Sequence, residues 1–104
     1  MIVRTWRCRA TPALADAYQA YLTGTVFAGL ARIAGHRGAQ LLRREVDGLV
    51  EFVAVSSWDS FDAIREYAGD TLDRAVVKPE ARALLADFDE FVAHYALAYA
   101  TGEG

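Results

Sequence analysis

His94 is the side chain best suited to acid–base chemistry in this chain of 104 residues. It lies in the segment EFVAHYALAY, residues 90–99, where side chains alternate as on a β-strand. A neutral imidazole in a closed cavity can take a proton from a phenol or an enol, so we expect His94 to be a catalytic base; the alternative is a hydrogen-bonded structural histidine. Neither His94 nor His36 has a neighbouring group of carboxylates or cysteines, and the sequence predicts no metal site.

Arg4 is a candidate for binding the anionic group of a substrate. It shares one face of the alternating segment IVRTWRCR, residues 2–9, with Trp6. If that face is buried, the guanidinium needs a partner, because an unpaired buried charge is costly. We therefore expect Arg4 either to form an ion pair with an acid such as Glu51 or to bind a substrate carboxylate or phenolate.

Arg74 is the second candidate for charge stabilisation. It lies in segment 69–79, a connector between two predicted helices that is longer than usual. Asp70 and Pro79 have structural explanations, as a cap and as the start of a helix. We expect the Arg74 side chain to close over an anionic ligand at a cavity entrance, or to pair with a partner chain.

Three aromatic side chains are candidates for binding a flat hydrophobic ligand: Trp6, Trp58 and Tyr67. Ligand pockets are mainly apolar with a few polar groups, so these rings can form the walls of one. For each tryptophan the alternative is simple packing in the core. The sequence predicts an aromatic or otherwise hydrophobic small molecule as ligand.

The composition excludes some classes of partner. Eleven basic and fourteen acidic residues give a formal net charge of −3, and the arginines are spread along the chain, which disfavours nucleic-acid binding. No apolar run is long enough to predict a membrane span. The single cysteine, Cys8, permits no intramolecular disulfide, and we expect a cytoplasmic protein.

The elements that position these residues can be predicted from periodicity and from turn signals. Gly24 and Gly29 weaken the last turns of the first helix, and Asp47-Gly48 is a hairpin signal. We expect strands over residues 2–9, 38–46, 49–58 and 90–99, helices over 12–31, 60–68 and 79–88, a single domain over 1–100 and a disordered tail over 101–104.

This order is βαββαβ, the split pattern of an α+β ferredoxin-like domain. Its antiparallel sheet carries helices on one face only. The other face would expose large apolar groups, so we expect two chains to pack sheet against sheet as a homodimer.

The segments SSWDSFDAIREYAGD (56–70), RAVVKPE (74–80) and VAHYALA (92–98) strengthen this interpretation. With the element order, they make the chain resemble the antibiotic biosynthesis monooxygenase-like proteins over residues 2–99. That resemblance implies a dimeric α/β barrel, in which each protomer keeps a cavity between sheet and helices. It also implies either oxidation of aromatic polyketides by molecular oxygen without a cofactor, or haem binding.

The residues expected in the haem-degrading branch are an Asn on the first strand, and a Trp on the second helix with a His shortly after it. This chain has no Asn, and no His between Asp59 and Pro79. The first hypothesis is a protein that binds an aromatic or otherwise hydrophobic small molecule and, as the resemblance implies, oxidises it as a cofactor-independent monooxygenase. In it His94 removes a proton, Arg4 or Arg74 stabilises charge, and Trp6, Trp58 and Tyr67 orient the ring. The alternatives are a non-catalytic protein that binds haem, with His94 as axial ligand, or another hydrophobic ligand, and a purely structural dimer with no site.

Overall fold

The computed structural model describes residues 1–102, so the predicted disorder of Glu103 and Gly104 lies outside the described residues. The elements are, in chain order, β1 (Ile2–Ala10), α1 (Pro12–Tyr21), the π-helix η1 (Leu22–Phe27), α2 (Ala28–Leu30), β2 (His36–Val46), β3 (Leu49–Trp58), α3 (Phe61–Ala68), α4 (Pro79–Leu84), β4 (Asp87–Phe88) and β5 (Ala93–Ala96).

The strands form one antiparallel sheet in which β1 is central. β3 pairs with the whole of β1, and β2 lies outside β3 in a hairpin. The other edge of β1 is shared, because β5 pairs with its first half and β4 with Cys8 and Arg9. Asp47 and Gly48 form the hairpin turn with positive φ angles of 54° and 78°. This confirms the α+β ferredoxin-like fold and the Asp-Gly turn.

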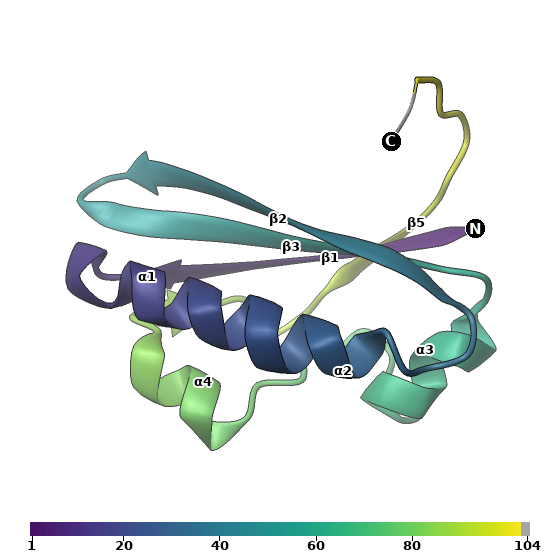
Figure 1. Ribbon diagram of the computed structural model, residues 1–104, viewed down its shortest axis with the longest axis horizontal. Coiled ribbons are helices and arrows are strands. Elements are labelled where there is room, and N and C mark those ends of the chain that lie inside the picture. The colour runs from purple at the N-terminus through teal and green to yellow at the C-terminus, as the bar shows by residue number, and fades with distance from the viewer. Residues whose placement is uncertain (103–104) are drawn as a thin grey trace.

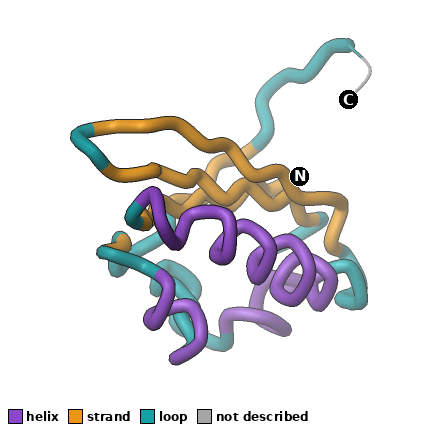
Figure 2. Tube along the Cα trace, turned by 60° about the vertical axis from the view of Figure 1, so that its left-hand side comes forward, coloured by secondary structure: helices purple, strands orange, loops and turns teal. Residues whose placement is uncertain are grey.

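All the helices lie on one face of the sheet (Figure 1). Figure 2 shows that the residues after β5 rise on the opposite side, away from the helices. We call that opposite side the open face. It is formed by every second residue of each strand, among them Val3, Thr5, Leu42, Val53, Val55 and Tyr95. Leu42 and Tyr95 are 54% and 59% exposed, so large apolar side chains lie there uncovered.

The long first helix predicted over 12–31 is present, but its second half is not a regular α-helix. Pro12 begins it, and the buried side chains of Ala15, Tyr18 and Leu22 follow at helical spacing. From Leu22 to Phe27 the hydrogen bonds are those of a π-helix. The sequence LTGTVF combines glycine with β-branched residues, which weaken α-helical geometry.

The last part of the chain differs from the prediction. The predicted helix over 79–88 ends at Leu84, and Asp87–Phe88 pairs with β1 instead. The predicted strand over 90–99 is regular only over Ala93–Ala96. Arg9 explains part of this difference, because its guanidinium pairs with Asp87 and Asp89 and draws that segment to β1.

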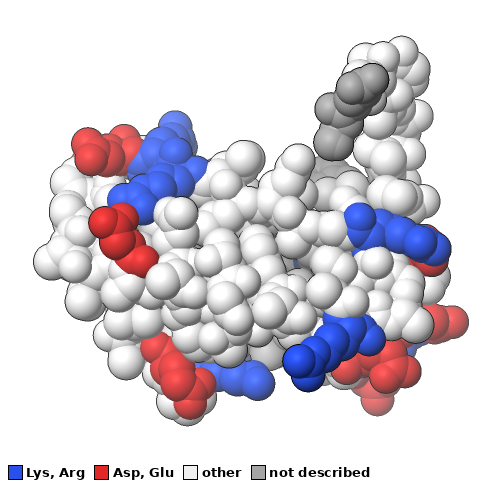
Figure 3. Space-filling model, viewed as in Figure 1, with Lys and Arg blue, Asp and Glu red and all other residues white. Residues whose placement is uncertain are grey.

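Two groups of buried side chains form the core between sheet and helices. The first surrounds Phe52 and Tyr18, whose ring centroids lie 5.2 Å apart. The second surrounds Trp58 and Ile64, both fully buried. Phe27 packs against both groups. The face drawn in Figure 3 is uncharged over its middle, where the first long helix runs, and residues 17–31 contain no charged side chain.

Gly35 joins α2 to β2 at a point where no side chain fits. Its φ is +91°, and a Cβ built there would lie 2.7 Å from the Cβ of Ala63. We expect Gly35→Ala to lower the free energy of unfolding by about 1–3 kcal/mol, since both the backbone and the neighbouring helix would be strained. Urea denaturation would measure it.

Gly24 provides the matched control. It lies in η1, and a Cβ there would meet nothing within 4 Å. Gly24→Ala is expected to leave stability unchanged or to raise it by up to about 1 kcal/mol, because alanine costs less backbone entropy in a helix. Equal destabilisation by both substitutions would contradict the close approach at Gly35.

Candidate functional site

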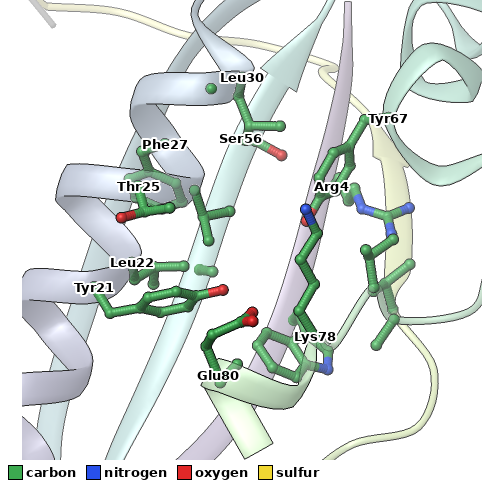
Figure 4. Close-up of a pocket in the computed structure, with 18 of the residues that line it drawn as sticks. Arg4, Tyr21, Leu22, Thr25, Phe27, Leu30, Ser56, Tyr67, Lys78 and Glu80 are labelled. Carbon is green, nitrogen blue, oxygen red and sulfur yellow. The ribbon is translucent and has the colours of Figure 1, made fainter.

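A cavity of about 630 Å³ lies between the sheet and the long helix. This volume is in the range of small-molecule sites, about 300–1,000 Å³. β1 and β3 form its floor, α1 and η1 form one wall, and the segment that leads into α4 forms the other (Figure 4). Residues of both core groups described above line it.

Most of the lining is apolar or aromatic. Trp6 contributes an indole ring whose Nε1 donates a hydrogen bond to the carbonyl oxygen of Asp89 at 2.6 Å. That bond satisfies the polar group of the indole, and it leaves the ring as an apolar surface for a ligand. Leu22, Phe27 and Leu30 face it from the helical wall (Figure 4). The cavity therefore fits a flat hydrophobic body.

Arg4 is only 5% exposed and lines the same cavity. Its Nη1 donates to the carbonyl oxygen of Leu72 at 2.7 Å, and its Nη2 donates to that of Arg74 at 3.2 Å. Glu51, the acid expected as its partner, lies on the open face and pairs with Arg44 instead. Among the described residues, the Arg4 guanidinium forms no ion pair.

His94 stands behind Arg4 and does not line the cavity. Its Nε2 lies 3.0 Å from Nη1 of Arg4. Arginine only donates, so Nε2 must be the acceptor, and His94 is the neutral Nδ1–H tautomer. Burial lowers the pKa of His94, and the Arg4 charge lowers it further, while Asp73 opposes this. Because its basic nitrogen is already occupied, His94 positions Arg4 in this structure and has no free nitrogen with which to act as the base.

Tyr67 lies beside Arg4, with the guanidinium carbon 5.9 Å from the ring centroid. This is a cation–π distance. Burial raises the pKa of Tyr67, although the Arg4 charge opposes the shift. Tyr67 lines the cavity together with Arg4 and Trp6, so the structure brings these three sequence-predicted site residues to one place.

Arg74 lies outside the cavity. Its side chain pairs with Glu90 at 2.7 Å, and its guanidinium carbon lies 5.4 Å from the ring centroid of Phe91. The backbone around it is fixed as well, since Ala75 N–H donates to the Glu90 carbonyl and Val92 N–H donates to the Asp73 carbonyl. Arg74 contributes to the site only through its backbone carbonyl, which accepts the hydrogen bond from Nη2 of Arg4.

Trp58 is fully buried and does not line the cavity, so its predicted role as a ligand wall is replaced by the core-packing alternative. The His36 ring packs edge-on against it at a centroid distance of 5.0 Å. Trp58 still touches the site indirectly, because its Nε1 donates to Oγ of Ser56 at 2.8 Å and Ser56 lines the cavity. The sequence pattern could not separate the two tryptophans, since both lie on strands at apolar positions.

The polar side chains that line the cavity and that the sequence analysis did not select include Tyr21, Lys78 and Glu80. In Figure 4 the Lys78 side chain runs up through the cavity toward Tyr67, while the Tyr21 hydroxyl and the Glu80 carboxylate point toward each other at the other end. Burial, and then the Glu80 charge, raise the pKa of Tyr21. Lys78 and Glu80 flank Pro79. The sequence analysis interpreted this segment as the start of a helix and therefore did not consider the two side chains as cavity residues.

A haem held through His94 does not fit these residues. His36 and His94, the two histidines of the chain, are both absent from the lining, and Nε2 of His94 already accepts a hydrogen bond. Burial also raises the pKa values of the lining residues Tyr18, Tyr21 and Tyr67, which disfavours a phenolate ligand. The described residues hold no cluster of three or more groups suited to a metal ion, and no described helix is long and apolar enough to cross a membrane.

Comparison with known proteins finds solved structures with a similar fold. No protein-family model and no curated protein matches the sequence. The structure is similar to a "putative antibiotic biosynthesis monooxygenase" from Bacillus cereus, with a TM-score of 0.66 and 16% identity over 98% of this chain and 97% of that one.

Two further similar structures have more specific names. SnoaB, a cofactor-independent oxygenase from Streptomyces nogalater, matches with a TM-score of 0.63 and 20% identity over 98% of this chain and 97% of that one. The haem degrader MhuD from Mycobacterium tuberculosis, solved with two haems in its active site, matches with a TM-score of 0.62 and 18% identity over 98% of this chain and all of that one. The chain therefore has the ferredoxin-like fold of the antibiotic biosynthesis monooxygenase-like structures, as its sequence motifs predicted.

Proposed function

We propose that this protein binds an aromatic or otherwise hydrophobic small molecule in the cavity above β1 and oxidises it with molecular oxygen, without a cofactor. The observation that carries the proposal is the cavity itself, an apolar space of about 630 Å³ with a buried arginine and a few other polar groups in its walls. The fold of the protein is also similar to that of SnoaB, the cofactor-independent oxygenase.

The residues at the site support a simple sequence of steps. Glu80 carries the one carboxylate among the described lining residues, so it takes the role of base that the sequence analysis gave to His94. It removes a proton from an activated CH₂ group of the substrate, and the positive charge of Arg4 stabilises the resulting anion. Oxygen adds to the carbanion and gives a hydroperoxide after protonation. Loss of water leaves a carbonyl, so one oxygen atom enters the product and the other leaves as water.

We further propose that the protein is a cytoplasmic homodimer built through the open face. That face carries Leu42, Val53, Val55 and Tyr95, which a partner sheet would cover. The last hydrogen bond to the sheet is from Leu97 N–H to the Met1 carbonyl at 2.9 Å. Beyond it the chain extends away on the open side, with Tyr99 80% exposed, and it can reach a partner there (Figure 1). The absence of a second cysteine supports a reducing compartment.

Oxygen uptake with anthrone as substrate tests the catalytic proposal. The wild-type protein is expected to consume one O₂ per anthraquinone formed, and Glu80→Gln is expected to slow this by about 100-fold, a usual contribution of a general base. Arg65→Gln is the control, because Arg65 lies on α3, outside the cavity, and pairs with Asp62. Binding of anthrone without oxygen uptake would instead support the non-catalytic ligand-binding alternative.

A further inference from the structure

The charges around the cavity are unequal. Three charged side chains line it: Arg4, Lys78 and Glu80. Two positive groups thus face one negative group within an otherwise uncharged wall. Arg4 is buried whereas Lys78 and Glu80 are exposed residues, so the low dielectric constant strengthens the selection for an anionic ligand most at Arg4.

Arg4 lacks a counter-ion although it is almost fully buried. Its partners among the described residues are two backbone carbonyls and a neutral imidazole. These three bonds use both N–H groups of Nη1 and one of Nη2, so the Nε–H and one Nη2–H remain as donors. A buried cation in this state is stabilised by any anion that reaches it, because an uncompensated buried charge is costly.

Lys78 brings a second positive charge toward the same end. It is the only lysine of the chain, and its position directly before Pro79 fixes its backbone in an extended conformation with ψ of 160°. From there the side chain enters the cavity and approaches Tyr67, the neighbour of Arg4 (Figure 4). Within the described residues Lys78 has no acid within ion-pair distance, since Glu80 points toward Tyr21 instead.

Ser56 adds a neutral donor beside these two. It is the register partner of Arg4 across β1 and β3, so both side chains leave the same face at adjacent positions. Its Oγ already accepts the indole N–H of Trp58, which leaves its own O–H to donate. This end of the cavity therefore gathers donors, whereas the far end carries the Glu80 carboxylate and would repel a second negative charge.

We propose that the substrate of this protein is an aromatic acid, whose carboxylate binds at the end formed by Arg4, Lys78 and Ser56 while its ring lies over Trp6 and Phe27. The proposal rests on the ligand-binding function above and adds the chemical class. Lys78 is then a specificity residue, since its charge is needed for acids and not for neutral ligands of the same shape.

A matched pair of probes tests this directly. 2-Naphthoate and 2-naphthamide have the same ring and nearly the same shape, but only the first is an anion at pH 7. Titration calorimetry with the wild-type protein is expected to show at least tenfold tighter binding of naphthoate. Lys78→Met is expected to remove most of that preference while leaving naphthamide binding unchanged. Arg65→Gln, which removes one positive charge away from the cavity, is expected to preserve it.

Arg4→Met extends the test to the buried charge, with the circular dichroism melting curve as a check that the variant folds. If Arg4→Met does not fold, the comparison of Lys78→Met with the wild-type protein still tests the proposal. Equal affinity of the wild-type protein for the two probes would overturn the acid proposal and leave hydrophobic ligand binding intact. A naphthoate preference that survives Lys78→Met would overturn the role of Lys78 as a specificity residue. Failure of both probes to bind would overturn the ligand-binding proposal as well.

Discussion

Trp58→Ala is expected to lower the free energy of unfolding by about 3–5 kcal/mol, as is usual for removal of a large buried aromatic side chain. Trp58 is 0% exposed and packs with Ile64, Leu30 and the ring of His36. Small domains have total stabilities of about 5–15 kcal/mol, so this one change would remove a large fraction. Urea denaturation followed by circular dichroism would measure the loss.

Trp6→Ala is the informative comparison, since Trp6 is the same residue type but lies at the cavity wall. It is half-buried and packs against Phe88 with a centroid distance of 6.1 Å. We expect Trp6→Ala to cost less stability than Trp58→Ala and to weaken naphthamide binding more. A Trp58→Ala protein of wild-type stability with no ligand binding would restore the role of Trp58 as a ligand wall.

Val55→Lys is expected to convert the proposed homodimer into a monomer. Val55 lies at the middle of the open face between Thr5 on β1 and Gln40 on β2, with no acid directly opposite it. A lysine buried between two packed sheets would lose its hydration without gaining a partner. We expect this desolvation cost to exceed the free energy that holds the two chains together. Sedimentation equilibrium would report a change from about 23 kDa, which is twice 11.4 kDa, to 11.4 kDa.

The control for this experiment is Ala17→Lys, which introduces the same charge on an exposed position of α1. It is expected to leave the dimer intact. A wild-type protein that sediments at 11.4 kDa at micromolar concentration would contradict the dimer proposal outright. A dimer that persists in Val55→Lys would show that another surface holds the two chains together.

Much of the fold could be predicted from the sequence because its signals are local. Alternation over residues 2–9, the Asp47-Gly48 turn and the Pro12 helix start each act within a few residues, and all three are present in the structure. The end of the chain was harder to predict. The local pattern predicts Asp87–Phe88 as the last turn of a helix. Its pairing with β1 depends on contacts with a distant segment, among them the ion pairs of Arg9 with Asp87 and Asp89.

The candidate site was only partly predictable for the same reason. Arg4 and Trp6 could be found from their shared strand face, and Tyr67 from its residue type. The connection between Arg4 and His94 depends on the pairing of β1 with β5, two segments about 90 residues apart, so their mutual hydrogen bond could not be read from spacing. Lys78 and Glu80 become cavity residues only because α4 packs beside the long helix.

The central position of β1 has a consequence for how the protein is made. β1 leaves the ribosome before its partners β3 and β5, which lie about 50 and 90 residues later in the chain. Its pairing with β5 and the bond from Arg4 to His94 therefore form only after β5 has been synthesised. Such long-range pairing slows folding and leaves apolar strand surface unprotected in the meantime. The nascent chain is thus exposed to aggregation until β5 is released, and the arrangement of Arg4 at the cavity forms late.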